Sequence, residues 1–123
     1  MKFSEEHDDK QFVITGYDDQ SIHINNQHFN QGFILTLDHF KPDWTPRIYA
    51  DLEVTHLNDI FELKPELILL GTGEKQVFPP KEIYLSLIHS KIGFEVMNTQ
   101  AACRTFNILT ADNRNVAAAL FFK

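Results

Sequence analysis

At 123 residues, the chain has the length of one domain with one sizeable core, and it is too short for two independent domains. Hydrophobic residues make up 43% of the chain and charged residues 23%, a composition that excludes disorder and predicts independent folding. Its 17 acidic and 11 basic side chains give a net charge of -6, and the basic residues are not clustered, which argues against binding of nucleic acid or anionic lipid.

The single cysteine and the first ten residues bear on where the chain is found. Cys103 cannot form an intramolecular disulfide, which fits a reducing compartment. Residues 1–10 are polar and acidic, unlike a secretory signal, and we expect this leader to be mobile. No apolar run approaches the roughly 20 residues that span a bilayer. These features predict a single domain over residues 1–123 that is soluble, cytoplasmic and not inserted into a membrane.

The N-terminal third favours short strands and turns. Residues 12–15 and 21–25 are β-favouring runs on either side of a polar turn at 16–19, which is the pattern of a hairpin. A second turn is expected at 25–28, followed by a third strand over 32–38. This part of the chain is therefore predicted to be rich in β-structure.

The next segment is less regular. Pro42 and Pro46 prevent a regular helix between residues 38 and 47 and suit a loop or a sheet edge. Residues 48–53 are predicted to form a short strand. A brief helix with one apolar face is predicted over residues 55–63.

The second half alternates strands with helices. Residues 67–70 form a continuous apolar run, as in a strand covered on both faces. A helix follows a proline-containing loop, with Pro80 in its first turn and Gly93 at its C-terminal cap. Its apolar residues repeat at helical spacing: Ile83, Tyr84, Leu87 and Ile88.

The alternation continues to the end of the chain. Residues 94–97 predict another strand, and Asn98 or Thr99 can cap a helix that is broken at 112–115. The inward-facing residues of this helix are expected to be Ala102, Phe106 and Leu109. Residues 116–122 are apolar at both odd and even positions, as in a strand that is buried on both faces, although the alanines would also suit a helix. The result is β-α-β-α-β, an α/β fold with a mainly parallel sheet extended or flanked by the N-terminal β segment.

The best candidate for a ligand site is the loop of Gly71, Thr72 and Gly73. It follows the apolar strand, and ligands usually bind at the carboxyl ends of strands in such sheets. Asn98 and Thr99 open the following helix, where free N–H groups favour an anion. If the two strands are parallel neighbours, both features lie at one edge and form a shared pocket. A structural turn and ordinary helix capping explain the same residues, and the structural turn is favoured.

Other reactive residues have simpler explanations. A thiolate beside Arg104 could be a nucleophile, but Cys103 is favoured as a small core residue, with Arg104 pinning a loop or lying at an interface. The six histidines show no paired metal-ligand spacing, so we predict no metal and no cofactor. His23 and His28 flank a turn and could converge, but surface histidines are the favoured interpretation.

Trp44 and Arg47 are candidates for a partner-binding site. Both lie in the proline-containing segment, and tryptophan and arginine are frequent in binding hot spots. A tryptophan packed over the sheet is the favoured alternative for Trp44. The exposure of its side chain decides between the two.

Four blocks of sequence occur together in a recognisable order. They are LLGTG at 69–73, FEVMNT at 94–99, AACRTFNIL at 101–109 and VAAAL at 116–120. In this respect the chain resembles the family of the mitochondrial complex I assembly factor 3, which includes small bacterial and archaeal Mth938-like domains of unknown function. The resemblance implies a three-layer α/β fold with a mixed central sheet, two packed helices and one antiparallel strand. It implies no established catalytic residues.

Two functions remain open at this stage. The resemblance, and the lack of a convincing acid–base, nucleophile or metal set, favour a non-catalytic interaction protein with a protein partner. The resemblance also implies a link to assembly of a respiratory or membrane complex. The alternative is a small-molecule binder or enzyme with an anion pocket formed by Gly71, Thr72, Gly73, Asn98, Thr99 and Arg104. The oligomeric state is not predicted.

Overall fold

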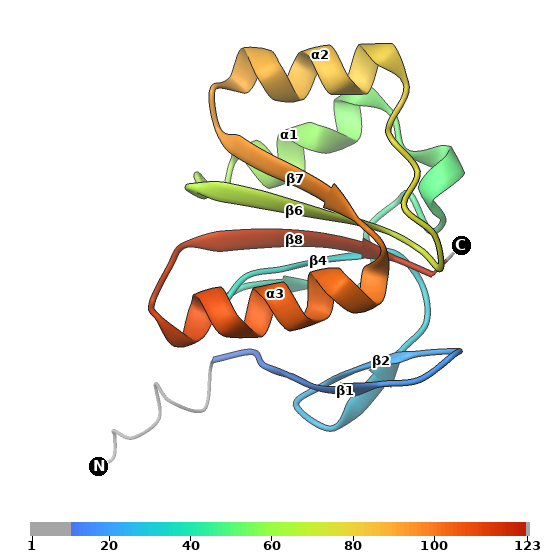
Figure 1. Ribbon diagram of the computed structural model, residues 1–123, viewed down its shortest axis with the longest axis vertical. Coiled ribbons are helices and arrows are strands. Elements are labelled where there is room, and N and C mark those ends of the chain that lie inside the picture. The colour runs from blue at the N-terminus through green and yellow to red at the C-terminus, as the bar shows by residue number, and fades with distance from the viewer. Residues whose placement is uncertain (1–10, 123) are drawn as a thin grey trace.

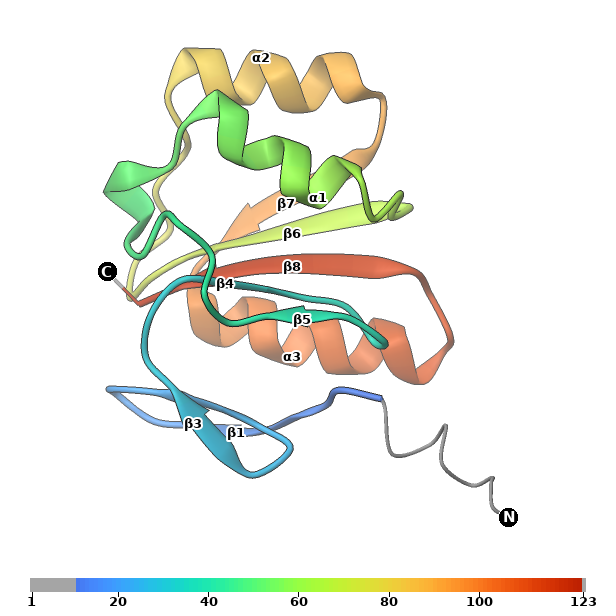
Figure 2. The ribbon, with the colours of Figure 1, turned by 180° about the vertical axis from the view of Figure 1, so that it is seen from behind.

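The computed structural model describes residues 11–122, so the acidic leader predicted over residues 1–10 lies outside the described residues. A five-stranded mixed sheet forms the middle layer (Figures 1 and 2). Its strands, in spatial order, are β5 (Phe40–Lys41), β4 (Phe33–Leu35), β8 (Val116–Phe121), β6 (Leu67–Thr72) and β7 (Gly93–Met97).

The three C-terminal strands are parallel, with β6 between β7 and β8. Helix α2 (Lys81–Ser90) connects β6 to β7, and helix α3 (Thr99–Ala111) connects β7 to β8. The second connection runs back past β6, in the opposite direction to the first, so right-handed crossovers place the two helices on opposite faces. Figure 1 shows this arrangement. The predicted β-α-β-α-β order is confirmed.

Strand β8 is buried along its whole length. Its side chains alternate between two hydrophobic cores, as the period of a strand requires. Ala117, Ala119 and Phe121 belong to the core shared with α2, and Val116, Ala118 and Leu120 belong to the core shared with α3. The predicted buried strand is confirmed, and its alanines are not helical.

Strand β4 supplies the antiparallel strand that the resemblance implied, pairing with both β8 and β5. The preceding residues form a separate antiparallel sheet of β1 (Ile14–Tyr17), β2 (Ile22–Ile24) and β3 (Gln27–Phe29). This small sheet buries isoleucines in the same core as α3, so α3 and the small sheet form the third layer (Figure 1). The predicted β1–β2 hairpin is confirmed.

The turn predicted at 25–28 is confirmed in its first half only. Asn25 and Asn26 have φ values of 51° and 71°, and two successive positive values characterise the tight turn that best matches strand twist. Strand β3 begins directly after them, at Gln27. Strand β3 is only three residues long and begins with the polar residues Gln27 and His28, which explains the absence of a strand signal in the sequence.

The strand predicted over 48–53 is wrong. This segment contains a 3-10 helix, η2 (Tyr49–Asp51). A second 3-10 turn, η3 (Val54–Leu57), leads into α1 (Asn58–Phe61), which confirms the helix predicted over 55–63. Figure 2 shows α1 on the same side of the sheet as α2, and Leu57 and Ile60 enter the core there.

Helix α2 forms where it was predicted, with different capping residues. Pro80 is its N-cap, one position before the first helical residue. Lys91, rather than Gly93, adopts the left-handed C-cap conformation, with a φ of 63°, and Gly93 instead begins β7. Within residues 11–122, no helix combines the length and the apolar character needed to cross a bilayer.

Candidate functional site

The glycine loop and the start of α3 meet at the carboxyl edge of β6 and β7. The N–H of Gly73 donates to Oγ1 of Thr99 at 2.8 Å, and the N–H of Thr99 donates to the carbonyl oxygen of Gly73 at 2.8 Å. The Thr99 hydroxyl in turn donates to the carbonyl oxygen of Phe121 at the end of β8. The two segments therefore lie at one edge, as the parallel-strand argument expected.

Asn98, Thr72 and Gly73, which were predicted to lie at this edge, stabilise the loop and the start of α3. Asn98 caps α3 through its side-chain oxygen, which accepts from the N–H of Ala101 at 2.8 Å. The Thr72 hydroxyl donates to the carbonyl oxygen of Lys75 and accepts from the N–H of Val77. Gly73 has a φ of 108°, which favours glycine. These bonds hold the loop closed on itself.

Gly71 and Arg104 lie outside the cavity at this edge. A Cβ atom on Gly71 would stand 2.8 Å from Cδ2 of Leu120 on β8 and 3.2 Å from Cβ of Ala102 on α3, so this glycine allows both elements to pack closely on β6. The guanidinium of Arg104 donates to the hydroxyl of Tyr17 at 3.2 Å. Arg104 thus fastens the β1–β2 hairpin to α3, in agreement with the loop-pinning interpretation.

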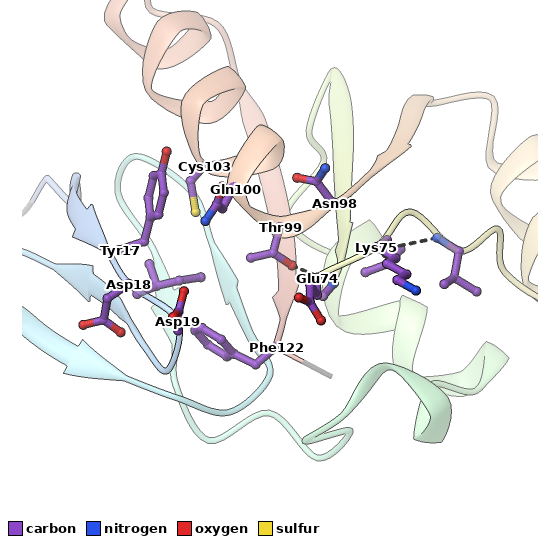
Figure 3. A pocket seen from close by; sticks show the side chains of 14 residues that line it. Tyr17, Asp18, Asp19, Glu74, Lys75, Asn98, Thr99, Gln100, Cys103 and Phe122 are labelled. Atoms are coloured by element: carbon purple, nitrogen blue, oxygen red, sulfur yellow. Dashed lines mark hydrogen bonds between the residues drawn. The ribbon is translucent and has the colours of Figure 1, made fainter.

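The cavity has a volume of about 770 Å³ and lies between the β1–β2 hairpin and this edge (Figure 3). Thr72, Gly73, Asn98 and Thr99 contribute to its lining, as predicted from the sequence. The hairpin forms the opposite wall, which the sequence did not indicate, because that contact depends on tertiary packing. Further lining residues are Tyr17, Asp18, Asp19, Ile22, Glu74, Lys75, Val77, Gln100, Cys103 and Phe122.

The charges at the cavity are mainly negative. Asp18, Asp19 and Glu74 carry carboxylates, and Lys75 carries the one positive charge among the lining residues that the structure describes. Asp18 accepts hydrogen bonds within its turn, and those from the backbone of Gln20 and the side chain of His23 lower the pKa of its carboxyl despite an opposing effect of desolvation. That carboxylate is therefore already engaged by the turn.

Cys103 also borders the cavity but is a poor nucleophile. Its side chain is buried, and this burial raises the pKa of the thiol to about 12, against a smaller lowering effect of Arg104. A thiol with that pKa is protonated at neutral pH, and the thiolate is the reactive form. The core interpretation of Cys103 is confirmed.

His23 and His28 do converge. Their rings stack with centroids 3.9 Å apart and nearly parallel planes, across the β2–β3 pair. Such face-to-face stacking does not aim two ring nitrogens at a common point. Among residues 11–122, no group of three or more histidine, cysteine or acidic side chains is placed to hold a metal ion.

Trp44 is not the exposed anchor that one interpretation required. Its side chain is 2% exposed and packs on Phe121, with ring centroids 5.5 Å apart. The indole N–H donates to a carboxylate oxygen of Asp59 at 3.2 Å, so the buried polar atom is satisfied. The alternative, packing over the sheet, is confirmed. Arg47 is exposed and donates to the side-chain oxygen of Gln31, and its role toward a partner stays a prediction.

A different apolar surface is exposed on the outer side of α2. We call it the α2 patch, and it consists of Phe78, Tyr84, Leu85 and Ile88. Phe78 is 69% exposed, and its ring lies 6.5 Å from that of Tyr84. Ile83 and Leu87 face the core instead. The sequence grouped Tyr84 and Ile88 with Ile83 and Leu87 at helical spacing, and the structure leaves Tyr84 and Ile88 exposed.

The architecture and the site together define a small three-layer α/β domain, with a mixed central sheet and a cavity where its parallel strands end. The chain belongs to the family described as "Protein of unknown function (DUF498/DUF598)", whose model matches residues 14–121. This match bears out the resemblance found in the sequence.

Two curated relatives illustrate the range of the family. The chain is 32% identical to the Drosophila melanogaster protein named NADH dehydrogenase [ubiquinone] 1 alpha subcomplex assembly factor 3, over 88% of this chain and 57% of the relative. It is 39% identical to a protein of Francisella tularensis named 13 kDa major membrane protein, over 56% of each. The chain thus spans little more than half the length of these relatives.

Solved structures support the fold. An NMR structure of a Xanthomonas campestris protein has a TM-score of 0.84 and 34% identity, covering 98% of this chain and 92% of that one. A Bordetella pertussis protein described as a Mth938-like domain has a TM-score of 0.76 and 28% identity, covering 89% of this chain and 85% of that one. The Mth938-like fold expected from the sequence is confirmed.

Proposed function

We propose that this chain is a non-catalytic interaction protein that helps to assemble a multisubunit respiratory or membrane complex, with the α2 patch as its partner-binding surface. The observation that carries the proposal is the outward-facing apolar side of α2. Small domains usually direct such side chains inward, and contiguous exposed apolar groups mark interaction sites.

The composition of the α2 patch suits a protein interface. Phe78 and Tyr84 offer large, stiff rings, and aromatic residues are enriched at the centres of interfaces. Covering a side chain as exposed as Phe78 contributes on the order of 2 kcal/mol, before the entropic cost of association. Tyr84 also lies against Phe94, with ring centroids 5.8 Å apart, so its position is fixed before a partner arrives.

The names of the relatives support the kind of partner. The Drosophila relative and one from Danio rerio, 35% identical over 88% of this chain, are both named as NADH dehydrogenase assembly factors. We infer an assembly-type role for this chain by that likeness, with subunits of a respiratory complex as the first partners to seek. The cytoplasmic location expected from the sequence stays a prediction.

The test is affinity capture of the tagged chain from its native lysate, followed by mass spectrometry. The informative variant carries Phe78→Gln and Ile88→Gln, which make the patch polar without touching the core residues of α2. Ile108→Gln is the matched control, because Ile108 is 66% exposed on α3 and lies outside the patch. We expect respiratory or membrane-complex subunits with the native chain and the control, and their loss with the patch variant.

Both variants should retain the native thermal unfolding midpoint, since each replaces exposed side chains. Equal recovery of the same subunits by the patch variant would exclude the α2 patch as the interface. Recovery of the tagged chain alone, from native and variant proteins alike, would contradict the assembly role itself.

A further inference from the structure

Several backbone donors beside the glycine loop are already in use. The N–H groups of Gly73, Thr99 and Ala101 are bonded within the protein. Arg104, the expected positive group, does not line the cavity and is directed to Tyr17. The backbone arrangement that suggested an anion site therefore stabilises the loop and the helix start.

The side chains around the cavity have the opposite preference. Asp19 projects from the hairpin and Glu74 from the loop after β6, so carboxylates approach the cavity from two walls (Figure 3). Neither forms an ion pair with another of residues 11–122. Both side chains are exposed to solvent. Lys75 is the one positive side chain among the described lining residues, against the carboxylates of Asp18, Asp19 and Glu74, so the lining as a whole favours a positively charged group.

Aromatic rings complete the lining. Tyr17 and Phe122 border the same cavity, and the faces of aromatic rings attract cations. The volume of about 770 Å³ accommodates an organic molecule or a few peptide residues rather than a bare ion. Carboxylates on two walls together with rings match a positive group carried on an aliphatic chain.

We propose that this cavity binds an organic cation, namely an ammonium or guanidinium group on a short aliphatic chain. Free amines and the lysine or arginine side chains of a peptide share this chemistry. The cavity and the α2 patch share no residue, so cation binding and the assembly role are tested by different variants.

The experiment is a titration of the full chain followed by amide NMR chemical shifts. Diaminobutane and a capped Gly-Arg-Gly peptide are the cationic probes, butanediol is the uncharged analogue, and inorganic phosphate is the anion. We expect both cations to shift the amide signals of Asp19, Gly73 and Glu74, with no saturable effect of butanediol or phosphate. Tighter binding of the diamine indicates a free amine as ligand, and tighter binding of the peptide indicates a protein segment.

Two double variants distinguish binding at the cavity carboxylates from a general effect of the net charge of the protein. Asp19→Asn with Glu74→Gln should weaken diaminobutane binding about tenfold, since two partly solvated ion pairs are lost. Glu82→Gln with Asp112→Asn removes the same charge away from the cavity and should leave binding unchanged. The proposal is overturned if neither cation binds, if phosphate binds more tightly than the cations, or if both double variants weaken binding equally.

Discussion

Thr99 allows the energetic role of the edge to be measured with a near-isosteric change. Its hydroxyl accepts from the N–H of Gly73 and donates to the carbonyl oxygen of Phe121, and the side chain is 7% exposed. Thr99→Val keeps the volume and removes both bonds. Each buried backbone group left without a partner costs about 1–3 kcal/mol, so we expect a total loss of about 3 kcal/mol in the free energy of unfolding.

Thr99→Ser is the matched control, because it keeps the hydroxyl and removes one methyl group, at about 1 kcal/mol. The difference of about 2 kcal/mol between the two variants corresponds to a shift of about 1 M in the urea midpoint. Equilibrium unfolding in urea, followed by circular dichroism, measures it. If Thr99→Val proves as stable as Thr99→Ser, the hydroxyl does not hold these three segments together and the reasoning fails.

Three further predictions concern single positions. Gly73→Ala places a side chain at a φ of 108° and should lower the free energy of unfolding by about 1–2 kcal/mol, measured by thermal melting; an unchanged melt would contradict it. Lys91→Gly relieves a left-handed C-cap at a φ of 63° and should stabilise by about 0.5–1 kcal/mol in the same assay, where a lower midpoint would count against the cap. Cys103 should resist alkylation at neutral pH until urea is added. Because burial raises the pKa of this thiol from 9.0 to about 12, its contribution to stability is present below pH 9 and lost as pH rises toward 12, and Cys103→Ala should show a shallower decline.

The second half of the fold could be predicted because its local signals agree with one another. The apolar run at 67–70 and the apolar strand at 116–122 both indicate burial on two faces, and a helix pattern lies between successive strands. Right-handed crossovers then allow few arrangements. Ala102 and Phe106 face the core as predicted, because the period of α3 is regular.

The first half was harder because its strands are short and its register is set by tertiary contacts. Strand β3 consists of Gln27–Phe29, with no apolar alternation to reveal it. Residues 48–53 contain β-favouring types, yet Tyr49–Asp51 form a 3-10 helix there, and Glu53 and His56 form a reciprocal cap that starts the next helical segment at Val54. Local hydrogen bonds of this kind can outweigh the preference of the residues for strands, and the amino-acid composition does not reveal them.

The candidate site was predictable only on one side. The carboxyl ends of parallel strands must share an edge, so the approach of Gly73 to Thr99 followed from topology. The wall formed by Tyr17 and Asp19 did not, because a hairpin more than 50 residues away in sequence carries no local signal of where it packs. The hairpin wall adds the carboxylates of Asp18 and Asp19 to the lining, and the proposed cation would interact with this wall as well as with Glu74.

The position of β8 in the sheet bears on how the protein is made. It is the last strand of the described chain, yet it lies between β4 and β6, and Phe33 pairs with Leu120 across 87 positions of sequence. Among the strands of residues 11–122, no other joins β4 and β5 to the parallel half of the large sheet. During translation, the sheet therefore stays in two unconnected parts until residues 116–121 have left the ribosome. Nascent chains shorter than this would present two unpaired strand edges, which are the surfaces that folding chaperones and aggregation both engage.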